Sequence, residues 1–277
     1  MEEASQFLAD QVGEARPLLG GTDTLVRMRD GAWSDSYLVD VKQFNGMDEI
    51  TLNADTGLRI GAAVNMNRVI AAPEVNAHYP LLAEAARTVA SYQLRSRATI
   101  VGNLCNGSPG GDTTGACIVL AGVLEVHGVN GRFHLPLTDF FKGPGKTALN
   151  PGDIVTAITF PVSPTGNVGR YRKLGRNALG DLAIVGVTTF AYPDNDQPSG
   201  YTFRLALASV APTPLVPTEA ETILANQPIT TETIDQAADA AMNVCKPISD
   251  TRGSARYRQQ MVRNLTRQAV TEVWQAL

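Results

Sequence analysis

The order of the expected strands and helices constrains this fold more than any other feature of the chain. The last third predicts two long strands, at 182–192 and 203–210, followed by three successive helices. Sequences that build a parallel sheet alternate strand and helix, whereas segregated strands and helices are typical of α+β proteins. We therefore expect an α+β fold with antiparallel strands in its C-terminal part.

Changes in the local pattern divide the chain into three expected parts. A small β/α part covers residues 1–56, a mixed part covers 57–168 and a C-terminal part covers 169–277. The mixed part includes a helix that starts at Pro80 and continues through Val89 and Ala90. It also includes a hairpin around Gly128–Gly131 and a strand at 154–160. In the C-terminal part, Thr218 and Glu221 have the spacing of a capping box at the start of the first helix.

Composition excludes several classes of protein. The net charge of −4 and the scattered basic residues argue against nucleic-acid binding, and no apolar run is long enough to span a membrane. The N-terminus lacks the basic and apolar regions of a secretory signal. The cysteines are Cys105, Cys117 and Cys245, an odd number without a Cys-x-x-Cys pair, which argues against a disulfide framework or an iron–sulfur site. We expect a cytoplasmic protein.

A first glycine turn lies between an expected strand and an expected short helix, at Leu18-Leu19-Gly20-Gly21-Thr22-Asp23-Thr24-Leu25. Glycines let backbone N–H groups approach a pyrophosphate closely, and a helix N-terminus adds partial positive charge. The turn lacks the Gly-x-Gly-x-x-Gly spacing of a Rossmann unit. By itself it also fits a plain tight turn, so both interpretations stay open.

A second polar stretch, from Thr99 to Asp112, predicts a long loop rich in glycine and asparagine. A loop of this length inside a compact domain is usually functional or disordered. Its backbone amides and the side chains of Thr99, Asn103 and Ser108 suit phosphate and sugar hydroxyl groups, and Asp112 suits sugar hydroxyl groups as an acceptor. With two such segments in one chain, a nucleotide-containing ligand becomes as good an interpretation as plain turns, and both stay open.

Together these segments resemble the two FAD-binding signatures of the flavoprotein subunits of molybdenum hydroxylases, the family of xanthine dehydrogenase, carbon monoxide dehydrogenase and nicotine dehydrogenase medium subunits. Further segments are similar in the same order along the chain. They are 140–147, 151–155, 171–176 with 180–185, 210–214 and 249–258. The resemblance covers nearly the whole chain. It implies a p-cresol methylhydroxylase/vanillyl-alcohol oxidase-type FAD domain in two subdomains, followed by a C-terminal α+β domain.

The resemblance also implies a role for each matching residue. The first turn would surround the FAD pyrophosphate, Thr99 to Asn103 would hold the phosphate and ribityl region, and Asp112 would bind a polar part of FAD. Val89 would pack near the adenine, Val155 would contact FAD through its backbone, and Lys173 would lie beside the flavin ring. The expected cofactor-binding residues are Leu18, Leu19, Gly20, Gly21, Thr22, Asp23, Thr24, Leu25, Val89, Thr99, Ile100, Val101, Gly102, Asn103, Asp112, Val155 and Lys173.

The implied function is electron transfer within a complex. The expected partners are a molybdopterin-binding large subunit and a small subunit with [2Fe–2S] clusters, and the acceptor is NAD, a quinone or oxygen. No catalytic or metal-ligating residue is expected in this chain. Two alternatives stay open, a self-sufficient FAD-dependent oxidase and a non-catalytic assembly subunit. The chain departs from the family pattern at Thr113-Thr114-Gly115, where two prolines usually follow the aspartate, and at its N-terminus, which starts at the helix.

Overall fold

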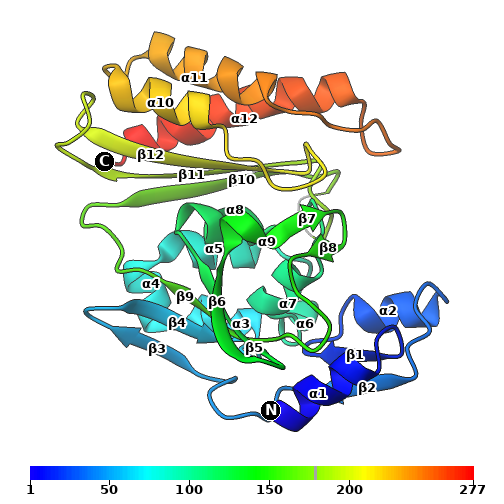
Figure 1. Ribbon diagram of the computed structural model, residues 1–277. Helices are drawn as coiled ribbons and strands as arrows, with labels where there is room; N and C mark the ends of the chain where they lie inside the picture. The colour runs from blue at the N-terminus through cyan, green and yellow to red at the C-terminus, as the bar shows by residue number, and fades with distance from the viewer. Residues whose placement is uncertain (178–179) are drawn as a thin grey trace.

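The computed structural model describes residues 1–177 and 180–277. The described residues form a small N-terminal unit, a five-stranded sheet with surrounding helices, and a C-terminal sheet covered by helices (Figure 1). The fold is α+β, as the segregated pattern of strands and helices predicts.

The N-terminal unit follows the expected order of elements. Helix α1 (Glu2–Asp10) precedes strand β1 (Ala15–Leu18), helix α2 (Thr24–Arg29) and strand β2 (Tyr37–Asp40). Strands β1 and β2 pair in parallel. The first glycine turn therefore connects β1 to α2, at one edge of this small sheet.

The second unit is built on an antiparallel sheet with the order β3-β4-β9-β5-β6. Its strands are β3 (Ile50–Asn53), β4 (Gly57–Gly61), β5 (Val123–Gly128), β6 (Gly131–Pro136) and β9 (Ile154–Phe160). The hairpin expected around Gly128–Gly131 is confirmed. The expected boundary after residue 56 falls inside the β3–β4 hairpin, so by sheet membership we propose a boundary before Ile50.

Six helices between β4 and β5 pack beside this sheet. They are α3 (Met66–Ala71), α4 (Pro73–His78), α5 (Pro80–Arg87), α6 (Tyr92–Arg95), α7 (Ile100–Cys105) and α8 (Thr114–Val119). The helix expected to run from Pro80 to Ala90 ends earlier, since Thr88 caps α5 and Ala90 has a positive φ of 43°. After β6 come helix α9 (Leu137–Phe140) and the short strands β7 (Phe141–Gly143) and β8 (Lys146–Thr147).

The stretch from Thr99 to Asp112 is not one long loop, because residues Ile100–Cys105 form helix α7. The Thr99 side chain caps this helix by accepting a hydrogen bond from the Gly102 backbone N–H at 2.9 Å. Ile100, Val101 and Leu104 are buried on its inner side. The high content of glycine, asparagine and threonine obscured this short helix, which packing and its N-cap stabilise.

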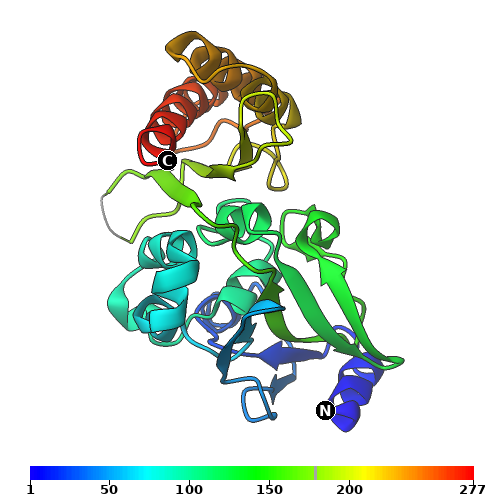
Figure 2. The same cartoon turned by 90° about the vertical axis from the view of Figure 1, so that its left-hand side faces the viewer.

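The C-terminal unit is an antiparallel sheet of three strands, β10 (Val168–Leu174), β11 (Val185–Pro193) and β12 (Tyr201–Ala208). Helices α10 (Thr218–Asn226), α11 (Thr231–Asn243) and α12 (Ala255–Trp274) form a layer on one side of it, and helices α5 and α8 of the second unit contact the other side (Figures 1 and 2). The first of the two strands expected here starts three residues later than expected, and β10 was not predicted at all.

The expected capping box at the start of α10 is wrong. Pro217 is the N-cap residue, and the helix has no side-chain cap. The carboxylate of Glu221 instead accepts a hydrogen bond from the backbone N–H of Leu205 on β12, at 2.7 Å. Glu221 is therefore committed to a tertiary contact that its sequence spacing does not reveal.

The hydrophobic side chains form two buried clusters. One lies between the five-stranded sheet, helices α3, α4, α5, α7 and α8, and the facing side of the three-stranded sheet, and the other lies between the three-stranded sheet and helices α10–α12. Among the described residues, no helix combines the length and the low polarity that a membrane crossing requires.

Candidate cofactor-binding site

A cavity of about 640 Å³ lies where the N-terminal unit, the second unit and the segment after β10 meet. Its walls come from the β1–α2 turn, from helix α7 and the turn after it, from the loop at 149–155 and from Gly180, Asp181 and Leu182. Cavities of a few hundred to about 1,000 Å³ hold organic cofactors in proteins. The cavity therefore brings together segments that lie far apart in the sequence.

The first glycine turn is one wall of this cavity. A Cβ atom at Gly20 would lie 2.2 Å from the carbonyl oxygen of Arg97, so only glycine lets this turn approach the segment before α7. Gly21 has a φ of 72°, in the left-handed region that favours glycine. The first glycine turn is thus in direct contact with the backbone at Arg97 and Ala98, immediately before the second segment, and the cavity lies beside that contact.

Helix α7 and the turn after it form a second wall. The Asn103 side chain accepts a hydrogen bond from the Thr113 hydroxyl at 2.7 Å, which ties α7 to the start of α8. A Cβ atom at Gly111 would lie 2.6 Å from the Thr114 hydroxyl oxygen, so a larger residue there would have to displace the Thr114 side chain.

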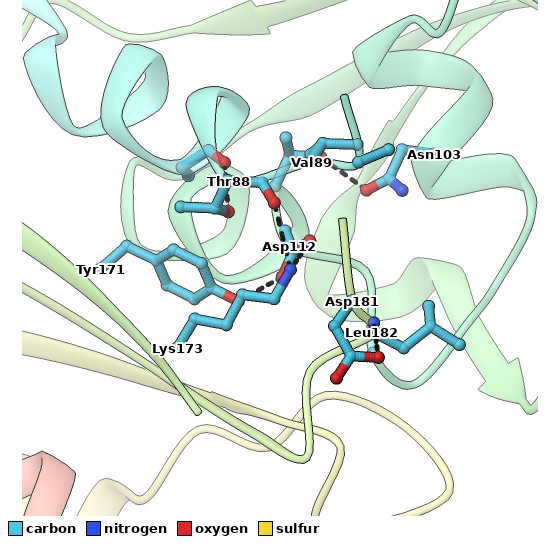
Figure 3. A network of polar contacts seen from close by, with 12 residues as sticks. Thr88, Val89, Asn103, Asp112, Tyr171, Lys173, Asp181 and Leu182 are labelled. Carbon is cyan, nitrogen blue, oxygen red and sulfur yellow. Dashed lines mark hydrogen bonds and ion pairs between the residues drawn. The ribbon is translucent and has the colours of Figure 1, made fainter. Parts of the chain in front are cut away.

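A buried polar cluster adjoins the cavity at Asp112 (Figure 3). Tyr171 and Lys173 on β10 both point toward this carboxylate. The Tyr171 hydroxyl donates a hydrogen bond to Oδ1 at 2.7 Å, and the Lys173 Nζ lies 2.8 Å from Oδ2 and 3.1 Å from the carbonyl oxygen of Thr88. The Lys173 and Asp112 side chains are 13% and 8% exposed, so the pair is shielded from solvent.

Burial determines the protonation behaviour of this cluster. Desolvation raises the pKa of Asp112 above its ordinary value, while Lys173 and the Tyr171 hydroxyl act in the opposite direction. Burial, followed by the nearby Asp112 carboxylate, raises the pKa of Tyr171 well above its ordinary value. Tyr171 is therefore a neutral hydrogen-bond donor, and Lys173 and Asp112 form an ion pair beside the cavity.

An aromatic side chain with two arginines lines another part of the cavity. The guanidinium carbon of Arg16 lies 3.7 Å from the ring centroid of Trp33, and that of Arg27 lies 4.5 Å from it. Arg27 also donates a hydrogen bond to the Asn106 side chain after α7, at 3.2 Å. Arg16 pairs with Asp35. These contacts join helix α2 to the turn after α7 and add positive charge to this wall.

The structure brings most of the expected cofactor-binding residues to one cavity. Its lining includes Leu19 to Thr24 of the first turn, Val89, Asp112 and Val155, and, from the second segment, Thr99, Val101, Gly102 and Asn103. Four expected residues do not line it. Leu18 supports the turn, Leu25 is half exposed, Ile100 is buried in the core, and Lys173 reaches the site only through Asp112.

Several residues around the cavity were not expected. Tyr171 lies in one of the quoted motifs, and an aromatic side chain two positions before Lys173 on the same strand face was a usable signal. Asp181 and Leu182 also lie in a quoted motif and line the cavity. Arg27 and Trp33 gave no sequence signal, because their contacts depend on how α2 packs.

The donor set fits a large dinucleotide cofactor rather than a metal ion. Among residues 1–177 and 180–277, no group of three or more His, Cys, Asp or Glu side chains is placed to hold a metal. Glycine turns in close backbone contact and a shielded Lys–Asp pair suit phosphate, sugar and flavin groups. The residues present thus fit FAD.

Comparison with known families agrees with this geometry. The model of the FAD-binding domain in molybdopterin dehydrogenases matches residues 1–163, and that of the carbon monoxide dehydrogenase flavoprotein C-terminal domain matches residues 170–273. A putative xanthine dehydrogenase FAD-binding subunit of Escherichia coli K12 is 30% identical over 274 residues, which is 98% of this chain and 92% of that protein. A carbon monoxide dehydrogenase medium chain of Hydrogenophaga pseudoflava is 32% identical, with 98% and 93% covered.

Solved structures show the same architecture. Carbon monoxide dehydrogenase from Hydrogenophaga pseudoflava superposes with a TM-score of 0.94 at 32% identity, covering 99% of this chain and 94% of that one. Quinoline 2-oxidoreductase from Pseudomonas putida 86 gives a TM-score of 0.91 at 25% identity, with the same coverage. The chain therefore belongs to the family of FAD-binding medium subunits of the molybdenum hydroxylases, as an oxidoreductase subunit whose cofactor is FAD.

Proposed function

We propose that this chain accepts electrons from [2Fe–2S] clusters of a partner subunit and passes them through FAD to an external acceptor. One observation carries the proposal: both glycine turns and the Asp112–Lys173 pair adjoin the same cavity. Bound FAD supplies the ability to exchange electrons singly or in pairs. The chain's own residues position FAD and control the charge around it.

Specific residues are proposed to hold each part of FAD. Backbone amides of the first turn and of the α7 N-terminus would bind the pyrophosphate and ribityl region. Val155 would contact FAD through its backbone, Val89 would pack against a ring, and Asp112 would accept a hydrogen bond from a polar group. Lys173 would stabilise negative charge on the flavin. The FAD-binding part is proposed to have the p-cresol methylhydroxylase/vanillyl-alcohol oxidase type of fold.

The proposed partners are a molybdopterin-binding large subunit and a [2Fe–2S] small subunit, with NAD, a quinone or oxygen as the acceptor. Relatives that match nearly the whole chain carry names such as medium chain and FAD-binding subunit, which are names of parts of complexes. In this arrangement the organic substrate binds to another subunit of the complex. The specificity of the complex would then reside outside the residues described here.

The purified chain tests this proposal directly. It should bind FAD in a one-to-one ratio, contain no iron or molybdenum, and fail to oxidise aldehydes or purines with a dye acceptor. After chemical reduction of the flavin, stopped-flow mixing with NAD, a quinone or oxygen should identify one acceptor that reoxidises it fastest. Addition of the reduced partner complex should reduce the flavin without any organic substrate.

Each alternative function predicts a different result. Turnover of an organic substrate by the chain alone would favour a self-sufficient oxidase. A chain that assembles with its partners but binds no FAD would be an assembly subunit. Either result would refute the proposal.

A further inference from the structure

Arg258, in the first turn of α12, is a buried cation with three well-aligned acceptors. It is 4% exposed. Its Nη1 donates hydrogen bonds to the carbonyl oxygens of Ile184 at 2.8 Å and Ser209 at 3.0 Å, and its Nη2 donates to Oδ1 of Asp250 at 2.8 Å. Burying a charge is costly unless it is paired and hydrogen-bonded. The acceptors of Arg258 therefore indicate which segments of the chain this cation holds in place.

The first acceptor belongs to the segment that forms the C-terminal wall of the cavity. Ile184 lies two residues after Leu182, and Gly180, Asp181 and Leu182 line the cavity. The backbone N–H of Ile184 donates to the carbonyl oxygen of Leu174 at 2.7 Å, and Leu174 directly follows Lys173. The peptide groups around Ile184 are thus fixed by β10 on one side and by Arg258 on the other.

The second acceptor contacts another wall of the cavity. Ser209 has a φ of 65°, an uncommon value for a residue other than glycine. Its backbone N–H donates to the carbonyl oxygen of Pro109 at 2.7 Å, and Pro109 directly precedes the cavity-lining residues Gly110, Gly111 and Asp112. A Cβ atom at Gly110 would lie 2.9 Å from the Ser209 hydroxyl oxygen, which shows how closely the two segments pack. Strained backbone of this kind persists where neighbouring contacts hold it.

Asp250 completes the arrangement. It accepts hydrogen bonds from the backbone N–H groups of Arg252 and Gly253 as well as from Arg258. These contacts, led by the bond from Arg252, hold the pKa of Asp250 at about 2. The motif at 249–258, which has no contact with the cavity itself, thus supplies a fixed negative charge that neutralises Arg258.

We propose that Arg258, held by Asp250, is a positioning residue for the FAD cavity. Through Ile184 and Ser209 it fixes two cavity walls, one at 180–184 and one at 109–112, from within the C-terminal unit. Arg258 does not touch the cofactor. The inference rests on FAD being the occupant of the cavity, and it assigns to the C-terminal unit a direct effect on how FAD is bound.

A purely structural role for Arg258 predicts a different pattern, in which any loss of FAD affinity follows the loss of stability. The test compares Arg258→Met with Val270→Ala, which removes a buried contact from the same helix without touching either wall. Arg263→Met is a second control, since Arg263 pairs at the surface of α12 with Asp239. For each variant, thermal melting of the apoprotein, FAD affinity, and the spectrum and midpoint potential of bound FAD are measured.

We expect Arg258→Met to weaken FAD binding by about tenfold or more relative to Val270→Ala, because small displacements of a binding wall strongly affect a bound group. At saturating FAD, the flavin spectrum and potential should change in Arg258→Met and stay as in the wild type in both controls. Hydrogen exchange of the apoprotein should increase at 181–185 and 109–112. Wild-type affinity and spectrum in Arg258→Met, or losses equal to those of Val270→Ala, would overturn the proposal.

Asp250→Asn carries the same test if Arg258→Met does not fold. This variant keeps an acceptor oxygen but removes the charge that neutralises Arg258, so the same changes are expected with smaller size. Unchanged FAD binding and exchange, together with a lower melting temperature, would also refute a positioning role. A wild-type protein that binds no FAD would refute the proposed function instead, and the exchange measurement would still decide whether Arg258 holds the two walls.

Discussion

Gly21 combines a left-handed backbone with a position on the cavity wall. Gly21→Asp would place a carboxylate next to the proposed pyrophosphate site. One like-charge pair near 4 Å costs about 4 kcal/mol at an effective dielectric of about 20, which is nearly three orders of magnitude in affinity. We expect FAD titration of the purified variant to show a loss of this size.

Gly31 provides a matched control for this substitution. It also has a φ of 72°, it lies just after α2, and a Cβ atom there would meet no other atom within 4 Å. Gly31→Asp therefore adds the same charge and similar backbone strain outside the cavity, and it should leave FAD affinity unchanged. Gly21→Ala adds no charge and tests only the backbone strain and the space for a methyl group. Wild-type affinity in Gly21→Asp would show that this turn does not bind the pyrophosphate.

The hydrogen bond between Tyr171 and Asp112 leads to a second prediction, on how the free energy of unfolding depends on pH. Burial raises the pKa of Asp112 above its ordinary value of 3.8, so ionisation of this carboxyl costs the folded chain stability as the pH rises through the raised pKa. The Tyr171 hydroxyl reduces that cost. Tyr171→Phe should therefore lower the free energy of unfolding by about 2 kcal/mol where Asp112 is ionised, and by less at acid pH where Asp112 is protonated.

Tyr79→Phe separates this electrostatic effect from the loss of any buried hydrogen bond. Tyr79 is equally buried, and its hydroxyl donates to the neutral carbonyl oxygen of Pro161 at 2.8 Å. Its loss should lower stability by an amount that does not depend on pH. Urea unfolding of both variants between pH 4 and pH 8 gives the comparison. Parallel pH profiles for the two variants would contradict a role for Tyr171 in stabilising the Asp112 carboxylate.

Helix α7 shows how an element of six residues depends on its N-cap. Thr99→Ala removes the acceptor for the Gly102 N–H and should cost about 1 kcal/mol, as is usual for the loss of such a cap. Because the start of α7 lines the cavity, FAD affinity should fall as well. Thr99→Ser should restore both properties. Chemical unfolding and FAD titration measure the two effects.

The cap of α11 is the appropriate comparison for Thr99. Thr230 accepts a hydrogen bond from the Thr233 backbone N–H at 3.2 Å, far along the chain from every segment that lines the cavity. Thr230→Ala should lower stability and leave FAD affinity unchanged. If the two cap variants affect FAD binding equally, the orientation of α7 does not matter for the cofactor.

Elements with a strong local pattern were predictable, and those that depend on distant partners were not. The β5–β6 hairpin and strand β9 follow from alternating side chains and a glycine turn. Strand β10 could not be predicted from its local pattern, because the charges of Arg172 and Lys173 are typical of an exposed linker. Its charges are compensated by Glu84, Glu272 and Asp112 from three other elements. The same limit hid the tertiary role of Glu221.

The residues of the candidate site also divide into those that the sequence predicts and those that it does not. Glycine turns leave a signature in the sequence, since their backbone geometry restricts which residue is allowed, and both turns reach the cavity. Tyr171 and Arg258 act through hydrogen bonds to residues more than 45 positions away. The spacing of a single sequence carries no information about such pairs. The resemblance to a known family placed Lys173 near the site, and the structure adds that Lys173 is paired with Asp112.

At the scale of the whole molecule, β10 joins the two larger units. The Glu84 carboxylate on α5 accepts a hydrogen bond from the backbone N–H of Tyr171 at 2.8 Å and from Arg172 at 3.3 Å. Glu84→Ala leaves a backbone N–H without its partner, which should cost about 1–3 kcal/mol. We expect calorimetry to show that the single unfolding transition of the wild type broadens or separates into two.

Glu221→Ala tests whether that separation is specific to the contact between units. Glu221 also accepts a backbone N–H, but both partners lie within the C-terminal unit. Its loss should lower the unfolding temperature while the transition stays single. Two transitions in Glu221→Ala, or a single sharp one in Glu84→Ala, would show that β10 does not couple the units.

The division of the cavity between units has a consequence for how the protein is made. A ribosome completes the N-terminal unit and the five-stranded sheet before it adds β10 and α12, and domains generally fold in that order. During that interval the glycine turns exist, but Asp112 lacks Lys173, the wall at 180–184 is not yet made, and the wall at 109–112 lacks the support of Arg258 through Ser209. We therefore expect FAD to bind weakly to a chain that has not yet made these contacts, and stable loading to follow the docking of α12.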